Sequence, residues 1–421
     1  MTITTELLPG VTLRCFPDTR FKQGALSFQI IRPMCRQEAA LNALIPTVLL
    51  RGTAKHPDLR SITLRLDELY GAAVGTTVRR VGDYQTTGLT CGFIEDKYAL
   101  PGDQVLEPMI DFLRELLLEP VIEDGGFDRG FVESEKKNLI STIESELNDK
   151  RAYAMNQMLR AMCKADSYGI PRLGSVEDAQ KIDPVEAFEH YCRILRTSRI
   201  DIFYVGSAPA ETVARLLSPL FAETDRDYMP LGPQTPFCDA GGEDLVETMD
   251  VSQGKLCLGY VTPITNRDPR FAAMQVMNAI LGAGMTSKLF MNVREKLSLC
   301  YSIGSGYYGS KGLVTVSAGI DFAKEQQTRE EIARQLDAIR NGDITYEELT
   351  SAKEAILSSL RSTHDSPGAI EGYYATAALS GMNMTPEQYM DAVRAVTAGE
   401  VSGAARELRL HTTYFLKGVT A

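Results

Sequence analysis

Two apolar stripes of helical spacing match each other at a constant distance along this chain. The first stripe is Leu41, Leu44, Ile45, Val48 and Leu49, and the second, 232 positions later, is Ala273, Val276, Met277, Ile280 and Leu281. Gly52 and Gly284 follow the stripes at that same offset. Such spacing puts apolar side chains on one helical face, and a match over so long a distance indicates an internal duplication.

Each stripe is followed by a pattern typical of a β-hairpin. In the first half, Ala73–Val81 and Tyr84–Ile94 flank the pair Gly82-Asp83, and in the second half Tyr301–Tyr308 and Leu313–Ile320 flank a segment with Gly309 and Gly312. Alternating strands around a glycine-containing turn predict a hairpin. Further alternating segments are expected to form strands at Val11–Ile31 and Lys255–Val261.

Long helices are predicted in both halves, at Val105–Leu118, Phe127–Asn148, Ala152–Lys164, Arg329–Arg340, Tyr346–Arg361 and Pro386–Thr397. Thr345 with Glu348, and Thr385 with Gln388, have the spacing of capping boxes. Asp268-Pro269 is predicted to supply the N-cap and first residue of the helix that carries the second stripe. Strands and helices in separate blocks predict the α+β class.

The segment from residue 223 to residue 243 has no apolar periodicity and is rich in Pro, Gly and Asp, which is typical of a linker. We therefore predict an N-terminal domain over residues 1–222, a linker over 223–243 and a C-terminal domain over 244–421. The 421 residues exceed one ordinary core. Each domain is expected to be a mainly antiparallel sheet with long helices packed on one face.

Composition excludes several classes of protein. A net charge of −11 and a pI near 5.1 argue against nucleic acid as a partner, which would need a clustered basic surface. No apolar run is long enough to span a membrane, and the N-terminus does not resemble a signal peptide, so we expect a cytoplasmic protein without a membrane partner.

The eight cysteines form no C-x-x-C pair, and most are expected to be small core residues. His190 and Cys192 could be imagined as metal ligands together with Cys163, but the other histidines supply no matching cluster. The glycines of residues 282–284 and 304–312 do not match a phosphate-binding loop and are interpreted as turn glycines.

Several stretches resemble the insulinase, pitrilysin and mitochondrial-processing-peptidase family of zinc peptidases over nearly the whole chain. They are Tyr168-Gly-Ile-Pro-Arg-Leu-Gly174, the strand Ile200–Gly206, and Gly282-Ala-Gly-Met-Thr-Ser-Lys-Leu-Phe290 followed by Val293-Arg-Glu-Lys-Leu-Ser-Leu-Cys-Tyr301. The resemblance implies two similar α+β domains arranged as a clamp.

Active members of that family carry an inverted zinc motif, H-x-x-E-H, a fixed distance before a Gly-Thr pair. Counting back from Gly52-Thr53, the two histidine positions hold Ala43 and Thr47, and the glutamate position holds Pro46. The family's third ligand is a glutamate, and counting on from Glu135 gives Thr142 at that position. None of these side chains is a usual zinc ligand. We therefore expect no zinc, no other cofactor and no hydrolytic activity by the chain alone.

The same resemblance makes Arg294 and Tyr301 candidate substrate-binding residues. In the family this pair contacts the substrate carbonyl, where a cation and a phenol can stabilise an oxyanion. The alternative interpretation is an ion-paired Arg294 after a helix and a half-buried Tyr301 on a strand.

The implied function is that of a substrate-binding, noncatalytic subunit of a heterodimeric peptidase. The zinc-bearing partner would be a paralogue, and the ligand a peptide or unfolded polypeptide. A scaffold protein with no role in proteolysis is the alternative. A closer resemblance, to a bacterial subgroup named for modification of elongation factor P, suggests a third role that no residue here explains.

Overall fold

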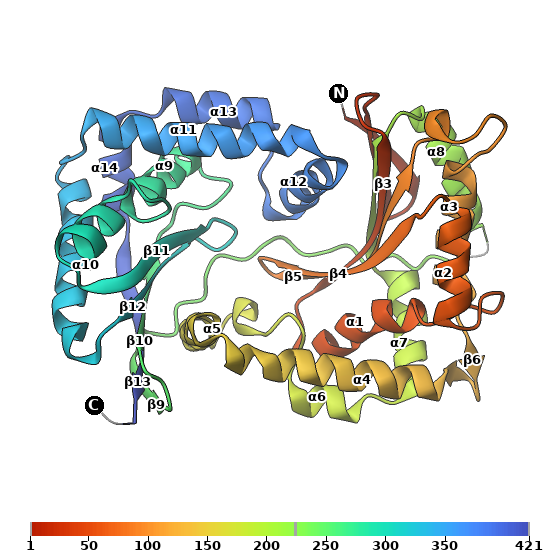
Figure 1. Cartoon of the computed structure of the whole chain (residues 1–421), viewed down its shortest axis with the longest axis horizontal. Helices are drawn as coiled ribbons and strands as arrows, with labels where there is room; N and C mark the ends of the chain where they lie inside the picture. The colour runs from red at the N-terminus through yellow and green to blue at the C-terminus, as the bar shows by residue number, and fades with distance from the viewer. Residues whose placement is uncertain (1, 223–224, 420–421) are drawn as a thin grey trace. The chain divides into compact units, whose positions relative to one another are not determined.

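The computed structural model describes residues 2–222 and 225–419, so the first two residues of the predicted linker lie outside the described residues. The chain forms two compact units (Figure 1). Unit 1 comprises Met1–Glu144, Ile170–Pro233 and His364–Thr376. Unit 2 comprises Ser145–Gly169, Gln234–Thr363 and Ala377–Ala421. Each unit therefore includes a segment from the sequence half that builds most of the other.

Unit 1 is built on a six-stranded sheet in the order β1-β2-β8-β3-β5-β4. Neighbouring strands are antiparallel except for β2 and β8, which run parallel. The strands are β1 (Ile3–Leu8), β2 (Val11–Pro17), β3 (Gln23–Pro33), β4 (Ala73–Val81), β5 (Tyr84–Ile94) and β8 (Arg199–Gly206). Strand β4 lies at one edge of this sheet.

Unit 2 repeats that topology with five strands in the order β11-β12-β10-β13-β9. They are β9 (Asp244–Met249), β10 (Gly254–Val261), β11 (Cys300–Tyr308), β12 (Leu313–Ile320) and β13 (Arg409–Gly418). Neighbours are again antiparallel, except for the parallel pair β13 and β9. Strands β4, β5, β3, β8 and β2 thus correspond to β11, β12, β10, β13 and β9. The prediction of two similar α+β halves is confirmed.

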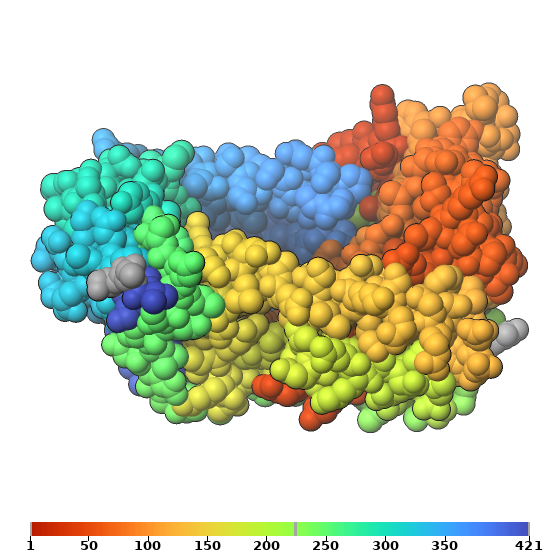
Figure 2. All heavy atoms as spheres, turned by 60° about the horizontal axis from the view of Figure 1, so that its bottom comes forward, coloured from red at the N-terminus to blue at the C-terminus, as the bar shows by residue number. Residues whose placement is uncertain are grey.

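One face of the unit 1 sheet is covered by helices that bury a continuous apolar core. They are α1 (Arg36–Leu49), α2 (Leu59–Glu68), α3 (Leu106–Leu118), α4 (Arg129–Glu144), α6 (Val176–Lys181), α7 (Pro184–Thr197) and α8 (Ala210–Leu217). The first apolar stripe forms α1, and most of its residues are buried. Figure 2 shows α4 (yellow) on the surface, with α6 (yellow-green) beside it.

The second stripe forms α9 (Phe271–Leu281), which ends 232 residues after α1. The helices around it in unit 2 are α10 (Glu325–Arg340), α11 (Tyr346–Ser362), α13 (Pro386–Ala395) and α14 (Ala398–Arg406). A π-helix follows α9 at Leu289–Lys296. Apolar periodicity at the same spacing therefore produces equivalent core helices in both units.

Each sheet also has a helix on its second face, and that helix comes from the other half of the sequence. In unit 2, α5 (Lys150–Met162) packs on β10, where Gly259 leaves room for Met158 and Met162. In unit 1 the covering segment is the beginning of α12 (Pro367–Ser380). Its Glu371 is 6% exposed and accepts hydrogen bonds from β3 and β4. This exchange of helices joins distant parts of the chain.

Local features agree closely with the sequence. Both hairpins form at the predicted residues, and Gly82, with a φ of 58°, occupies the turn between β4 and β5. The capping boxes at Thr345 and Thr385 are present. Most of the cysteines are buried, as predicted.

Three local predictions were wrong. Helix α9 begins at Phe271 because the carboxylate of Asp268 binds the backbone N–H and guanidinium of Arg270 instead of capping the helix. The alternating segment Val11–Ile31 forms two strands, β2 and β3, separated by a loop. The predicted helix Phe127–Asn148 is shorter, since α4 ends at Glu144 and a 3₁₀ turn follows it. Across the described residues, no helix is both long and apolar enough to cross a membrane.

Candidate functional site

The positions that align with the family's zinc ligands surround one cavity in unit 1. The cavity has a volume of about 480 Å³, and Ala43, Thr47 and Thr142 all contribute to its lining. Helix α1 supplies the first two residues and helix α4 supplies the third. Pro46 is buried within α1 and is not part of the lining.

Among the lining threonines, Thr47 and Thr142 are hydrogen-bonded to their own helices. Thr47 Oγ1 donates to the carbonyl of Leu44 at 2.7 Å, and Thr142 Oγ1 donates to the carbonyl of Asn138 at 2.8 Å. Both hydroxyl protons are therefore engaged within the helix that carries them. Neutral hydroxyls are poor substitutes for the imidazoles and carboxylate that hold zinc.

Glu135 is the one carboxylate among the described lining residues. Its side chain is 7% exposed and forms an ion pair with Arg51 of the segment after α1. Asn138 Nδ2 donates to the same carboxylate at 3.2 Å. A carboxylate already neutralised by a guanidinium has little charge left for a cation.

The donor set of the cavity therefore does not fit a zinc ion. Imidazole and thiolate are missing from the described lining residues, and its carboxylate is already paired. Within residues 2–222 and 225–419, no group of three or more His, Cys, Asp or Glu side chains is arranged to hold a metal ion. The side chains themselves thus depart from the ligand set of active family members.

The edge strand β4 forms one wall of the same cavity through residues 76–79. The carbonyl of Val78 points away from β5, since Arg172 Nη1 donates to it at 3.2 Å. In an antiparallel pair, the N–H and C=O of every second residue point away from the neighbouring strand. Thr76 lies two residues before Val78, so its N–H and C=O also point outward. An outward-facing strand edge can pair with an extended peptide.

Arg79 of β4 is held on the second face of the sheet by Glu371 of α12. Its guanidinium donates to the carboxylate at 3.1 Å and 3.3 Å. Ser27 and Gln29 of β3 donate to the same carboxylate, and the Ser27 bond measures 3.0 Å. Glu371 thus fixes the guanidinium of Arg79, a residue that contributes to the cavity lining.

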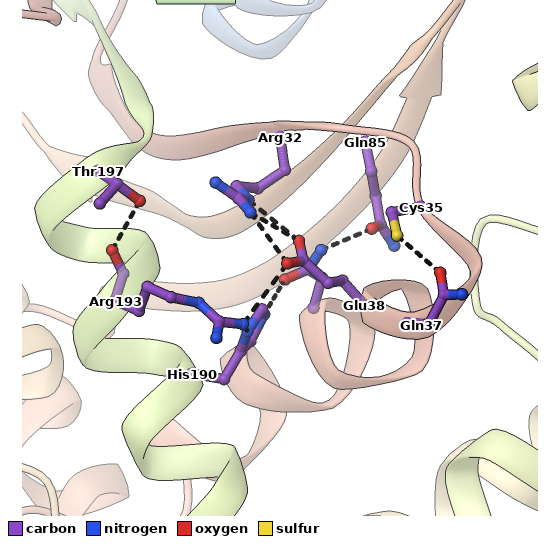
Figure 3. Close-up of polar contacts among 9 residues, drawn as sticks. Arg32, Cys35, Gln37, Glu38, Gln85, His190, Arg193 and Thr197 are labelled. Carbon is purple, nitrogen blue, oxygen red and sulfur yellow. Dashed lines mark hydrogen bonds and ion pairs between the residues drawn. The ribbon is translucent and has the colours of Figure 1, made fainter. Parts of the chain in front are cut away.

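A network of polar side chains, of which Asn42 and His190 are buried, connects α1 with neighbouring elements (Figure 3). Arg32 forms a bidentate ion pair with Glu38 at 2.9–3.1 Å. Arg193 approaches Glu38 at 3.5 Å and His190 Nδ1 at 2.5 Å. His190 Nε2 lies 2.7 Å from Asn42 Oδ1. These contacts join α1 to β3 and α7.

His190 is a neutral structural residue in this network. Burial lowers the pKa of His190 to about 4. The negative charge of Glu38 raises this pKa, whereas the positive charges of Arg193 and Arg32 lower it. Since Arg193 can only donate, Nδ1 is the acceptor and Nε2 carries the proton that bonds Asn42. Both ring nitrogens are therefore engaged.

His190 and Cys192 lie on α7, and Cys163 directly follows α5. None of these three belongs to a metal-holding group of His, Cys, Asp or Glu among the described residues.

Arg294 and Tyr301 lie in unit 2, at the end of the π-helix and the beginning of β11. The guanidinium of Arg294 lies 4.6 Å from the ring centroid of Phe290 and forms an ion pair with Glu295 at 3.4 Å. A turn at Ser298, with a φ of 50°, connects the two elements. Arg294 remains about a third exposed, so its cation is accessible to a ligand.

Tyr301 is 61% exposed, and its hydroxyl donates to Asp321 at 2.8 Å. This hydrogen bond raises the pKa of the Tyr301 phenol and lowers the pKa of the Asp321 carboxyl. At neutral pH the phenol is therefore protonated and can donate. A ligand that takes this donor must replace Asp321 as its acceptor.

Sequence reasoning missed Arg79, Arg172 and Glu371. The first two line the cavity and the third holds Arg79. The hairpin pattern predicts strand β4 but not the role of its residues. Glu371 lies 292 residues from Arg79, so no local sequence pattern connects them.

Comparison with known proteins identifies the family. The family description "Peptidase M16 inactive domain" matches residues 182–356. The "Probable inactive metalloprotease YmfF" of Bacillus subtilis is 30% identical over 97% of this chain and 96% of its own length. The chain belongs to the M16 peptidase family.

Solved structures agree with this M16 assignment. A conserved protein from Enterococcus faecalis V583 has a TM-score of 0.92 and 28% identity, and the match covers 100% of this chain and 99% of that one. A peptidase M16 inactive domain from Pseudomonas fluorescens has a TM-score of 0.84 over the same shares at 17% identity. Together with the substituted zinc positions, these relatives make the chain an inactive M16 homologue. The resemblance to the insulinase and pitrilysin family is confirmed.

Proposed function

We propose that this M16 homologue is the substrate-binding, noncatalytic subunit of a heterodimeric peptidase, in which a paralogous partner carries the zinc. The observation that carries the proposal is the cavity at the degenerate zinc positions. The cavity has a volume of about 480 Å³, and its donor set does not suit a metal. A pocket of this size without a metal-ligand set is suited to holding part of a substrate.

The edge of β4 supports a peptide or unfolded polypeptide as the ligand. Strand addition to a free edge depends on backbone hydrogen bonds and so accepts many sequences. Thr76 lies on this edge with its N–H and C=O outward, and its side chain is exposed. The Thr47 hydroxyl, which donates to the carbonyl of Leu44, can still accept an N–H group of a bound peptide.

Arg294 and Tyr301 provide a second group of contacts in this proposal. A cation and a phenolic donor are suited to the carbonyl oxygen of a substrate, where negative charge develops during hydrolysis. The family pairs them with a zinc site, whose ligand positions are substituted at Ala43, Thr47 and Thr142 in this chain. In the heterodimer, the partner would supply zinc and this chain would supply Arg294 and Tyr301. We place the complex in the cytoplasm, which suits a chain with free cysteines.

Peptide binding can be tested directly with a strand-blocking variant. Fluorescence anisotropy of a labelled unfolded peptide should show saturable binding to the wild-type chain. Thr76→Pro removes the outward N–H and should weaken that binding by about tenfold, equivalent to ~1.4 kcal/mol. Thr76→Ser keeps the backbone donor and is the matched control. Binding that is the same in all three proteins would place the peptide elsewhere.

The heterodimer requires a separate experiment. The chain should co-purify with a co-expressed M16 protein of similar length that carries H-x-x-E-H, and the mixture should cut peptides that neither protein cuts alone. Zinc analysis of this chain by itself should give far less than one equivalent. Complex formation without any gain in cleavage would favour the scaffold role instead.

A further inference from the structure

Unit 2 contains a second cavity, of about 570 Å³, where the beginning of α5 meets the turn between β9 and β10. Its charged lining residues are Asp149, Lys150, Arg151, Asp250 and Lys255, and its neutral polar residues include Ser252 and Gln253. Three cations therefore face two carboxylates, in a chain whose net charge is −11.

The carboxylate of Asp149 is already used by the helix. Asp149 Oδ1 accepts the N–H groups of Arg151 and Ala152, both at 3.0 Å, as the N-cap of α5. This cap also means that the helix end itself offers few free donors to a ligand. The binding capacity of the cavity must therefore come from side chains.

The three cations lack anionic partners within the described part of the chain. Lys150, Arg151 and Lys255 form no ion pair there, whereas Arg160 of the same helix α5 pairs with Glu146. Lys255 Nζ donates only to the neutral amide oxygen of Gln253. An amide oxygen satisfies a hydrogen bond without neutralising the ammonium charge.

Lys255 of β10 and Arg151 of α5 come from different elements and line the same cavity. Arg151 reaches across the sheet to within 3.9 Å of the position that a Cβ would take at Gly304 of β11. Burial lowers the pKa of Lys255, and the positive charge of Arg151 lowers it further. The negative charge of Asp149 raises this pKa, but by less. An anion bound beside both cations would relieve the repulsion between them.

We propose that this cavity binds a small multivalent oxyanion, carrying either phosphoryl groups or several carboxylates. Arg151 and Lys255 would supply charge-assisted hydrogen bonds from opposite walls. The amide N–H₂ of Gln253 and the hydroxyl of Ser252 add neutral donors on the same turn. A cavity of this size suits a small organic ligand rather than a single ion. The site is independent of the peptide-binding role in unit 1.

Isothermal titration calorimetry of the full chain tests the proposal. Pyrophosphate and citrate are the two probes, titrated at constant ionic strength in chloride buffer. At least one should bind saturably with one site per chain, and the tighter probe identifies the chemistry of the oxyanion. Raising the salt concentration should weaken the binding, because the Debye length falls to ~3 Å at 1 M. Absence of saturable binding by both probes would overturn the proposal.

Charge-removing variants locate the site. Arg151→Gln with Lys255→Gln should weaken binding by about tenfold or more, since each lost contact is charge-assisted. Lys150→Gln with Arg151→Gln changes only the beginning of α5. Weaker binding by this second double variant could not be explained by misfolding from a substitution in β10. Lys181→Gln, an exposed lysine of α6 in unit 1, is the control. Unchanged affinity in both double variants would exclude this cavity.

Discussion

The hydroxyl of Thr87 donates to the main-chain carbonyl of Asn42 at 2.5 Å. In a regular helix that carbonyl would accept the N–H of the residue at position 46, but Pro46 has none. Strand β5 thus supplies the hydrogen bond that the proline removes from α1. The residue in the glutamate position of the former zinc motif is accommodated by a specific contact with the sheet beneath it.

Replacing Thr87 by Val should destabilise unit 1 by about 1–3 kcal/mol, because the buried Asn42 carbonyl loses its donor. In a Pro46→Ala background the loss should be much smaller, since that substitution restores a backbone N–H that can donate to the same carbonyl. Denaturant unfolding of the four proteins forms a double-mutant cycle. Equal losses in both backgrounds would show that Thr87 does not compensate for the proline.

Stability should fall as the pH falls from 6.5 towards 4, and His190 is one cause. Burial holds its pKa near 4, below the ordinary value of 6.5, so the unfolded chain takes up the proton first. The stabilising contribution is thus complete above pH 6.5 and is lost as the pH approaches 4. Glu38 favours the protonated ring, while Arg193 and Arg32 oppose it.

His190→Gln keeps an N–H donor for Asn42 and has no proton to gain in that range. Its unfolding midpoint should therefore depend less on pH between 4 and 6.5 than that of the wild type. Thermal unfolding followed by circular dichroism at several pH values measures the difference. Parallel curves for the two proteins would assign the acid sensitivity to other groups.

What the sequence predicts well is local. The stripe of α1, the stripe of α9 and the hairpin at Gly82-Asp83 depend on residues a few positions apart, and each forms where expected. Capping at Thr345 is equally local. Periodicity and turn chemistry act over short distances, so they can be read from one segment at a time.

Long-range pairing is what the sequence does not reveal. The bonds from Arg79 to Glu371 depend on the beginning of α12 packing on the unit 1 sheet, and the ion pair of Arg51 with Glu135 joins two separate helical regions. The resemblance to M16 peptidases, with counting from Gly52-Thr53 and Glu135, assigned Ala43, Thr47 and Thr142 to the ligand positions. Only the folded structure shows that the nearby carboxylate of Glu135 is neutralised by Arg51.

Zinc binding should return only when several ligands are restored together. Ala43→His with Thr47→His places two imidazoles one turn apart, and Thr142→Glu adds a carboxylate from α4. The triple variant should hold about one equivalent of zinc after dialysis, as three protein ligands do in catalytic sites. Thr142→Glu alone is the control and should hold none. Stoichiometric zinc in the wild-type chain would contradict the degenerate-site interpretation.

Arg294 and Tyr301 should matter only when a zinc-bearing partner is present. In the heterodimer, Arg294→Ala or Tyr301→Phe should lower peptide turnover by ~10²-fold, as the loss of an oxyanion donor does. Lys296→Ala, on the same π-helix, should leave turnover unchanged and controls for charge. Asp321→Ala frees the Tyr301 hydroxyl from its acceptor and should not lower turnover. If the Arg294 and Tyr301 variants cleaved at the wild-type rate, both residues would be ordinary surface side chains, and the partner alone would perform the hydrolysis.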